Sequence, residues 1–455
     1  MERLVVIGGD AAGMSAAAQT RRRRGEDELE IVCFEKGRAT SYSACGIPYW
    51  ISGIVDSEQD LIARTPEEHR ARGLDVRMCT EVTGIDLARR EVRWAAADDS
   101  GSMGFDHLVY ATGSVPVRPP IPGIDAPGVF GVQTLDDGVE LRAALVDAAR
   151  VVVVGGGYIG LEIAEACKLR GLEVSVIDRA ETPIGTVDPD VGEFLAKAVR
   201  GLGIELLLSD GAAEITMGAD GRANGVVTES GRRLAADVVV LGLGVRPNVA
   251  LAEQAGIPLG ASGGIAVDSM MRTQVPGVWA AGDCVESVHR LSKRRVVVAL
   301  GTHANKQGRV IGINLGGGYA TFAGVIGTAA TKICAMEVAR TGLSSEEAEA
   351  AGFGFVTAVV DSTTTAGYMP GAEPIRLKML AERRSGRLLG AQIVGQHGSA
   401  KRIDALAIAI WNEMSVDEVL GLDLSYAPPF SPVWDPVLIA ARKAQEAVEA
   451  DLAVP

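Results

Sequence analysis

Two glycine-rich turns constrain the fold of this 455-residue chain more than any other feature. The first turn, residues 8–13, reads Gly-Gly-Asp-Ala-Ala-Gly and follows the apolar run 4–7. The second turn, residues 155–160, reads Gly-Gly-Gly-Tyr-Ile-Gly and follows four valines at 151–154. Each turn leads into an Ala-rich stretch. A buried strand, a tight turn and a helix in this order predict the start of a βαβ unit in a parallel sheet.

An acidic residue follows each turn at a characteristic distance. Glu35 ends a strand-like run and lies 22 residues after Gly13, and Asp178 ends another run 18 residues after Gly160. This spacing is typical of the carboxylate that binds a ribose hydroxyl in dinucleotide-binding folds. The glycines let the backbone approach a pyrophosphate, and the helix N-terminus offers free N–H groups to it. One such turn also occurs without a ligand, but two copies with their acids predict two bound dinucleotides.

The charge and the cysteines exclude several other functions. The net charge is −14 and the pI is about 5.0, which argues against binding nucleic acid or an anionic membrane. We expect a cytoplasmic protein, because the sequence shows no secretory signal and no apolar run near the ~20 residues of a membrane span. No two of the six cysteines lie within five residues of each other, so local C-x-x-C pairs are excluded. These cysteines are Cys33, Cys45, Cys79, Cys167, Cys284 and Cys334.

The remaining segments predict a three-domain α/β protein. A turn, a short strand and a Gly-Asp pair occupy 273–283, and two further segments read as strands that cross between domains. After about residue 323 the pattern changes to antiparallel strands followed by a helix, which predicts a separate α+β domain. The crossing strands are 110–113 and 244–248; the later strands are 355–360, 375–380 and 388–394, and the helix is about 400–413.

In this order the segments resemble the FAD/NAD(P)-dependent pyridine nucleotide-disulfide oxidoreductase family over essentially the whole chain. The resemblance implies two Rossmann-like domains, one for FAD and one for NAD(P)H, and a C-terminal α+β dimerisation domain. The FAD domain is expected in two parts, 1–112 and 245–322. The NAD(P)H domain is expected at 113–244 and the dimerisation domain at 323–455.

Three stretches make the resemblance more specific. Residues 41–49, Ser-Tyr-Ser-Ala-Cys-Gly-Ile-Pro-Tyr, resemble the single-cysteine motif of coenzyme A-disulfide reductases and their persulfide-reductase and NADH-oxidase relatives. Residues 367–372 and 423–432 are similar to theirs as well. The resemblance implies a homodimer that shares its active sites, with FAD and NADH or NADPH as cofactors and a small thiol or disulfide, possibly coenzyme A, as substrate.

Cys45 is the candidate redox centre. Relatives that form an internal disulfide carry a second cysteine five residues on, where this chain has Trp50, and Thr40 stands five residues before. A lone redox cysteine cycles through a mixed disulfide or a sulfenic acid. If 45–48 opens a helix with Pro48 in its first turn, the helix dipole lowers the pKa of Cys45. The alternative is a buried structural cysteine, which is the role we expect of the other five.

The acceptor is the main functional question. Ala11 stands where oxidase and peroxidase relatives carry a histidine, and losing that acid–base group costs roughly 10²–10⁴-fold in rate. We therefore expect reduction of a disulfide or persulfide, with coenzyme A disulfide favoured. The alternatives are an NAD(P)H oxidase or peroxidase that cycles Cys45 through sulfenic acid, and an electron-transfer reductase for a protein partner. By motif match, Tyr426 and Tyr368 of the partner subunit supply the proton, unless they only pack a turn.

The resemblance assigns the remaining site residues, with some alternatives open. Asp178 favours NADH, but Arg179 could pair with the 2′-phosphate of NADPH. Glu162 orients the nicotinamide amide or is an exposed helix residue, and the arginines 21–24 clamp coenzyme A phosphates or cap a solvated helix. The FAD set is Gly8, Gly9, Ala11, Ala12, Gly13, Glu35, Lys36, Ser43, Ala111, Thr112, Gly113, Gly282 and Asp283; the NAD(P)H set is Gly155, Gly157, Tyr158, Ile159, Gly160, Glu162, Asp178, Arg179 and Gly244; the substrate set is Gln19, Arg22, Ser41 and Tyr42.

Overall fold

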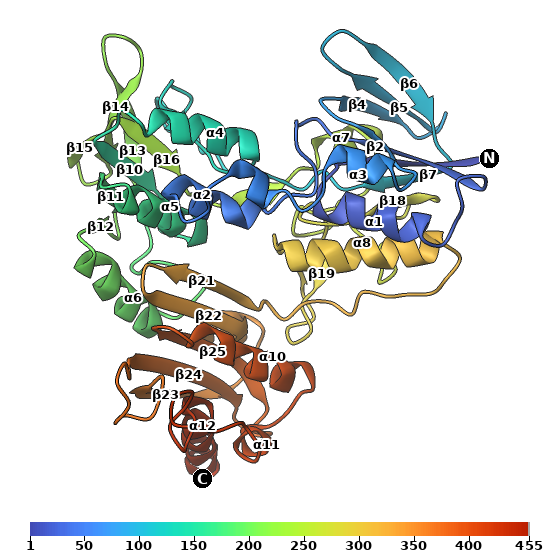
Figure 1. The fold of residues 1–455 in the computed structure, drawn as a ribbon. Coiled ribbons are helices and arrows are strands. Elements are labelled where there is room, and N and C mark those ends of the chain that lie inside the picture. Colours follow the sequence, from blue (N-terminus) through green and yellow to red (C-terminus); the bar gives the residue numbers. More distant parts are fainter. Residues whose placement is uncertain (454–455) are drawn as a thin grey trace.

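The first glycine turn follows the central strand of a five-stranded parallel sheet, which is drawn mostly in blue in Figure 1. The computed structural model describes residues 1–453. Strand β1 (Glu2–Ile7) is central and pairs in parallel with β2 (Leu29–Phe34) and β7 (His107–Tyr110). The strand order is β18-β7-β1-β2-β3, with β3 at Asp75–Arg77 and β18 at Val278–Ala280.

Two helices lie side by side on this sheet. Helix α1 (Ala11–Arg21) follows the glycine turn, and α8 (Gly301–Leu315) packs along it. Glycines make the close approach possible: a Cβ on Gly308 would lie 2.2 Å from the Ala12 carbonyl oxygen. The N-terminal end of α1 is therefore held between the sheet and a second helix.

A second five-stranded parallel sheet repeats the pattern with the middle of the chain, green in Figure 1. Its central strand β10 (Arg150–Val154) leads through the second glycine turn into α5 (Tyr158–Leu169). Strand β10 pairs in parallel with β11 (Glu173–Ile177) and β16 (Val238–Leu241). The order is β12-β11-β10-β16-β9, with β12 at Glu205–Leu207 and β9 at Val129–Phe130; helices α4 (Leu135–Ala144) and α6 (Pro189–Gly201) belong to the same part of the chain.

Two short strands connect the sheets. Strand β8 (Ser114–Pro116) pairs antiparallel with β17 (Val245–Pro247), as expected for crossing segments. Smaller elements decorate the two units: the sheet β4 (Glu81–Asp86), β5 (Glu91–Ala95), β6 (Ser100–Gly104); the sheet β13 (Ala212–Met217), β14 (Ala223–Thr228), β15 (Arg233–Ala235); the pair β19 (Ser287–Val288) and β20 (Arg295–Val296); and helices α3 (Pro66–Arg70) and α7 (Ala250–Ala255).

The C-terminal part forms an antiparallel sheet, orange to red in Figure 1. The three expected strands are confirmed as β23 (Phe355–Thr363), β24 (Pro374–Glu382) and β25 (Leu388–Gly395). Two strands and a long helix were not predicted. The order is β21-β22-β25-β24-β23, with β21 at Ala329–Ile333 and β22 at Met336–Gly342; the helices are α9 (Ser345–Ala350), α10 (Ile403–Trp411), α11 (Val416–Leu420) and α12 (Pro436–Leu452).

The helix that follows Cys45 packs on the second unit rather than on the first. Helix α2 (Ile47–Ser52) contacts α5 and α4, and Figure 1 shows it beside them. Its apolar residues Ile47, Trp50 and Ile51 belong to the same hydrophobic cluster as β10, β11 and α5. The Arg170 guanidinium, just after α5, donates to the Ile51 carbonyl at 3.0 Å. The cysteine segment therefore joins the two dinucleotide-binding units.

No helix within residues 1–453 combines the length and the apolar character needed to cross a membrane.

Candidate active site

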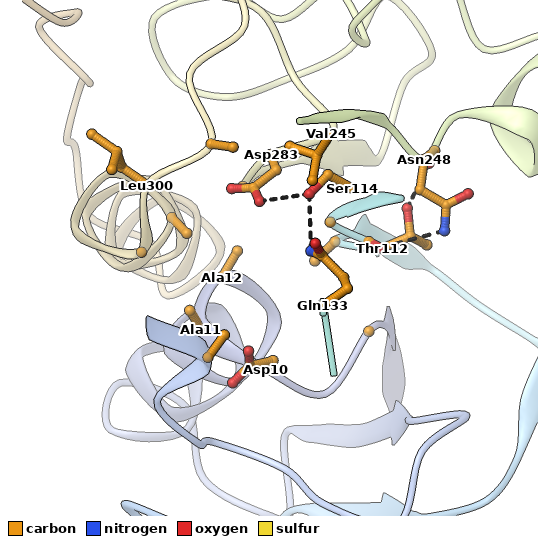
Figure 2. A pocket seen from close by; sticks show the side chains of 18 of the residues that line it. Asp10, Ala11, Ala12, Thr112, Ser114, Gln133, Val245, Asn248, Asp283 and Leu300 are labelled. Atoms are coloured by element: carbon orange, nitrogen blue, oxygen red, sulfur yellow. Dashed lines mark hydrogen bonds between the residues drawn. The ribbon is translucent and has the colours of Figure 1, made fainter. Parts of the chain in front are cut away.

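A cavity of about 2050 Å³ occupies the junction of the three domains. Its wall includes the first glycine turn, the segment around Cys45, the start of α5 and strand β21. Figure 2 shows one part of it, where Asp10, Ala11 and Ala12 face Asp283 and Leu300 across the space. The cavity thus brings the cysteine together with parts of both glycine turns.

The first glycine turn has the geometry that a pyrophosphate needs. Gly8 has φ +106°, and a Cβ there would lie 2.1 Å from the Ala111 carbonyl oxygen. A Cβ on Gly13 would lie 1.9 Å from the Gly8 carbonyl oxygen, so only glycine allows α1 to start this close to β1. The two Glu35 carboxylate oxygens accept from the N–H groups of Gly9 (2.8 Å) and Gly37 (2.7 Å). This cradle fits a dinucleotide.

The second turn repeats the same geometry. Gly155 has φ +108°, and a Cβ on Gly160 would lie 1.9 Å from the Gly155 carbonyl oxygen. The Asp178 carboxylate accepts from the N–H groups of Gly156 (2.5 Å) and Ala180 (2.8 Å). Each carboxylate oxygen keeps a further lone pair, so Asp178 retains acceptors for ribose hydroxyls. This turn also fits a dinucleotide.

A polar network that the sequence did not predict supports Asp283. Ser114 donates to the Asp283 carboxylate at 2.9 Å, and the Gln133 amide donates to Ser114 at 3.1 Å (Figure 2). Burial raises the pKa of Asp283. On its other side, the N–H of Gly282 donates to the buried Gln307 side chain at 2.8 Å. Residues of the connecting strand β8, of the segment between β9 and α4, and of α8 therefore fix the Gly282-Asp283 turn.

Asp10 is the main functional candidate that the sequence reasoning missed. It stands at the N-cap of α1 but does not cap the helix; its carboxylate accepts from the Tyr42 N–H at 3.2 Å. Burial, together with the charges of Glu35 and Asp283, raises its pKa to about 6. An acidic residue is unusual inside a glycine turn that binds an anion. This is the sequence feature from which Asp10 could have been identified. Asp10 connects the pyrophosphate cradle to the cysteine segment.

Cys45 opens into the cavity. It lies in a 3₁₀ turn (Ala44–Gly46) that leads into α2, with Pro48 in the first turn of that helix as expected. Cys45 is exposed, so the alternative of a buried structural cysteine does not apply to it. The predicted direction of its pKa shift is wrong: partial burial, followed by the charges of Glu162 and Asp283, raises the pKa of the thiol. Local desolvation and like charge outweigh the end of a six-residue helix.

The other five cysteines do not line this cavity in the described chain. Cys33, Cys167 and Cys284 are buried, and burial raises the pKa of each to about 12. Burial likewise raises the pKa of half-buried Cys334 to about 11, whereas Cys79 is exposed on the surface. All six are free thiols in the described chain.

A polar arm of the cavity holds the four residues expected at the substrate. Gln19 and Arg22 lie at the C-terminal end of α1, and the Arg22 guanidinium donates to Oε1 of the Gln19 side chain at 3.4 Å. Ser41, with φ +50°, is hydrogen-bonded to the His69 ring at 2.9 Å, and burial lowers the pKa of His69 to about 4. Tyr42 lines the same arm, and burial raises the pKa of its phenol. A neutral His69 therefore joins this set, which the sequence reasoning had not included.

The four arginines at 21–24 have different surroundings. Arg21 donates to the backbone carbonyls of Gly73 and Leu29, and Arg24 pairs with Glu2 at 2.6 Å. Of the four arginines, only Arg22 lines the cavity. The run is therefore mostly structural, with one member available to a ligand.

The start of α5 forms the opposite wall. The Tyr158 hydroxyl is hydrogen-bonded to Thr186 at 3.1 Å, and the Glu162 carboxylate accepts from Thr331 at 2.5 Å. Burial raises the pKa of both Tyr158 and Glu162. Glu162 is thus half-buried and faces the cavity, not bulk solvent.

The two candidate tyrosines lie elsewhere on the surface. Tyr368 and Tyr426 are 76% and 48% exposed, and neither lines the cavity that contains Cys45 of the same chain. Slight desolvation and the neighbouring Tyr368 hydroxyl raise the pKa of Tyr426, so the two phenols lie close together. They form one patch on the C-terminal domain.

The structure gathers most of the expected residues around the cavity. The residues that line the cavity lie near the first turn, the crossing strands or the start of α5. The other residues lie behind the turns, away from the cavity, or on the surface. The lining residues are Gly8, Ala11, Ala12, Glu35, Lys36, Ser43, Ala111, Thr112, Gly113, Gly282, Asp283, Tyr158, Ile159, Glu162, Gln19, Arg22, Ser41, Tyr42 and Cys45; outside it are Gly9, Gly13, Gly155, Gly157, Gly160, Asp178, Arg179, Gly244, Tyr368 and Tyr426.

Two dinucleotide cradles with one thiol between them define an oxidoreductase that moves electrons from a nucleotide to sulfur. Models of known families agree with this. The family model described as pyridine nucleotide-disulphide oxidoreductase matches residues 2–308, and the model of its dimerisation domain matches residues 328–436. The chain belongs to the pyridine nucleotide-disulphide oxidoreductase family, whose cofactors are FAD and NAD(P)H.

Individual relatives match over nearly the full length. A "NAD(P)H sulfur oxidoreductase (CoA-dependent)" of Pyrococcus abyssi is 38% identical over 445 residues, which cover 96% of this chain and 97% of the relative. An "NADH oxidase" of Methanocaldococcus jannaschii is 36% identical over 449 residues, covering 97% and 98%. The solved structure of an NAD-dependent persulfide reductase from A. fulgidus has a TM-score of 0.95 and 36% identity, covering 98% of this chain and 84% of that one.

Proposed function

We propose that this protein reduces a low-molecular-weight disulfide or persulfide, with coenzyme A disulfide favoured, using NAD(P)H and FAD. One observation carries the proposal: Cys45 is the one thiol that faces the cavity in the described chain, and both glycine turns contribute to that cavity's surroundings. The sulfur and coenzyme A activities named for the Pyrococcus abyssi relative, together with the persulfide reductase structure, support the choice of acceptor.

The first unit holds the FAD in this proposal. The Gly8–Gly13 turn binds the pyrophosphate, Glu35 accepts from the ribose and Asp283 faces the flavin end. The second unit binds the nicotinamide dinucleotide through the Gly155–Gly160 turn and Asp178. When bound, the flavin takes a hydride from the nicotinamide and returns the electron pair to sulfur. Tyr158 and Glu162 shape the space where the nicotinamide enters.

Cys45 performs the sulfur chemistry. Its thiolate attacks one sulfur of the substrate, the S–S bond breaks, and the first thiolate leaves and takes a proton. Two electrons then reduce the mixed disulfide, which releases the second thiol and restores the Cys45 thiolate. Trp50, buried where a second cysteine would stand, offers no thiol to resolve the mixed disulfide internally. The sulfur that pairs with Cys45 therefore comes from the substrate and not from a second cysteine of the motif.

We assign the proton to the partner subunit's Tyr426 and the partner subunit's Tyr368. Both phenols are exposed and close together on the dimerisation domain, away from the Cys45 of the same chain. Such a position suits a homodimer in which one chain completes the other's site. Gln19, Arg22, Ser41 and Tyr42 form the substrate arm, where Arg22 suits a phosphate of coenzyme A.

The test compares two variants of the FAD-loaded enzyme, each with one cysteine replaced by serine. Turnover of NADH and NADPH is followed with coenzyme A disulfide, coenzyme A persulfide and polysulfide as acceptors. Cys45→Ser should lose turnover of the true acceptor and keep its flavin. Cys79→Ser, an exposed cysteine outside the cavity, is the matched control and should behave as wild type. The proposal fails if Cys45→Ser turns over every acceptor as fast as wild type does.

The Methanocaldococcus jannaschii relative named NADH oxidase favours one alternative, in which oxygen is the acceptor. Ala11 offers no acid–base group beside Cys45, which weighs against it. Oxygen consumption that accounts for all NADH oxidised, with no thiol released, would establish the alternative. Mass spectrometry without reductant distinguishes the two hypotheses further. A coenzyme A adduct on Cys45 supports the disulfide or persulfide reductase, and a sulfenic acid on Cys45 supports the oxidase.

A further inference from the structure

The side chain of Arg179 forms an ion pair with the carboxylate of Glu229, which lies 50 residues later in the same unit. Its Nε and Nη2 atoms donate to Oε1 of Glu229 at 3.1 Å and 2.5 Å. Glu229 lies in the turn between β14 and β15, and its own N–H donates to the Gly211 carbonyl at 2.8 Å. Arg179 follows Asp178 directly, so this pair sits beside the carboxylate that faces the adenosine ribose.

A glycine makes room for the pair. A Cβ on Gly211 would lie 2.5 Å from the Arg179 Nε and 2.7 Å from the Glu229 Oε2. Neither contact is possible for a real side chain, so any larger residue at 211 would displace the guanidinium or the carboxylate. The local backbone therefore accommodates Arg179 in this orientation, although both side chains are exposed, at 68% and 46%.

The surroundings are acidic. Asp210 follows the β12 strand, its N–H donates to the Asp178 carbonyl, and its carboxylate accepts from Ser230 at 3.0 Å and 2.6 Å. That hydrogen bond from Ser230 lowers the pKa of Asp210 and keeps it charged. A ribose hydroxyl can donate to Asp178, but a 2′-phosphate would approach three carboxylates and a guanidinium already in use.

We infer that Glu229 is a specificity-determining residue, which makes the enzyme select NADH over NADPH by holding Arg179 and adding a carboxylate beside Asp178. The inference rests on the proposed function only in placing a nicotinamide dinucleotide at the second turn. Arg179 alone would suit a 2′-phosphate, because guanidinium groups bind phosphate in a two-pronged geometry. Glu229 removes that option.

The test measures binding of NADH and NADPH to the FAD-loaded protein by calorimetry, and so does not depend on any acceptor. Wild type should bind NADH more tightly. Glu229→Gln should tighten NADPH binding about fivefold, the scale of an exposed charge pair, and leave NADH binding unchanged. Adding Arg179→Ala should abolish the gain, because the freed guanidinium produces it.

A matched control addresses the hairpin itself. Glu205→Gln, in β12, removes the charge that pairs with Arg232 of the same β14–β15 turn; Glu205 is bonded to Arg232 and Ser175, not to Arg179. It should leave both affinities as in wild type. The inference is overturned if Glu229→Gln does not tighten NADPH binding, if Glu205→Gln tightens it equally, or if wild type binds both dinucleotides equally. Wild type that binds neither dinucleotide contradicts the proposed function as well.

Discussion

The two glycine turns are built alike but lie in different surroundings. In both, the first glycine has φ near +107° (+106° and +108°) and the last glycine approaches the first carbonyl so closely that a Cβ would lie 1.9 Å away. In both, a carboxylate at the end of the next strand accepts from the turn's N–H groups. Most of the first turn and its acid Glu35 line the large cavity together with α8, whereas at the second turn only Tyr158 and Ile159 line it and Asp178 lies outside. Enclosure suits a cofactor that stays bound, and an open edge suits one that exchanges at each turnover.

The largest expected effect tests whether the turns serve different ligands. Gly13→Ala and Gly160→Ala each place a Cβ 1.9 Å from a backbone oxygen, so neither turn can keep its shape. We expect Gly13→Ala to lose FAD, seen as loss of flavin absorbance in the purified protein. We expect Gly160→Ala to keep FAD and to lose NADH binding by at least about tenfold. If both variants lost only FAD, the assignment of the second turn would be wrong.

The second prediction concerns the acid that only the first turn contains. The pKa of Asp10 rises from 3.8 to about 6, so between these values the folded state keeps a proton that the unfolded state releases. Stability therefore falls as pH rises through this window, by about 3 kcal/mol in total. Asp10→Asn cannot ionise and should be more stable than wild type above pH 6 by up to that amount, and equal to it near pH 3.5. Urea unfolding at several pH values measures the difference.

The reciprocal change sharpens the same comparison. Gly157 occupies the matching position in the second turn and has φ −76° as the N-cap of α5, so a side chain is tolerated there. Gly157→Asp should weaken NADH binding because it places a carboxylate beside the pyrophosphate, and Gly157→Asn should weaken it less. Equal effects of the two variants would show that size rather than charge matters at this position.

A smaller effect is expected where α8 closes the first site. The buried Gln307 accepts from the Gly282 N–H at 2.8 Å and donates to Ser287 at 3.0 Å. Gln307→Leu leaves both groups without this partner and should cost about 2 kcal/mol of stability. FAD release should become faster while NADH binding stays as in wild type. Unchanged FAD release would show that α8 does not help to retain the cofactor.

The smallest effect concerns the ends of the two helices. After α5, Arg170 is committed to the Ile51 carbonyl, whereas after α1 Arg22 points into the cavity. Arg22→Ala should raise the KM for coenzyme A disulfide a few-fold. Arg24→Ala, which breaks an ion pair with Glu2 and a 3.5 Å hydrogen bond to the Glu28 carbonyl, should change KM little and stability by less than about 1 kcal/mol. Steady-state kinetics of both variants decides whether Arg22 contacts the substrate.

The sequence predicted the features that depend on local spacing. The two strands, turns and acids follow from short-range pattern, because glycine geometry and a carboxylate at the end of the next strand are fixed within one βαβ unit. The features it missed depend on residues far apart in the chain. Ser114 meets Asp283 across 169 positions, and Arg179 meets Glu229 across 50. The predicted direction of the Cys45 pKa shift was wrong because the shift depends on burial of the thiol and on the charges of Glu162 and Asp283, and only the folded chain produces these surroundings.

The packing of α2 has a consequence for anyone who recombines members of this family. Chain order assigns residues 47–52 to the first unit, but their apolar side chains complete the core of the second. A chimera that exchanges the middle of the chain alone would separate Ile47, Trp50 and Ile51 from the neighbours they pack against. The part of the chain that can be exchanged as a unit is therefore discontinuous. A chimera in which α2 is exchanged together with the central segment keeps the packing interface next to Cys45 intact.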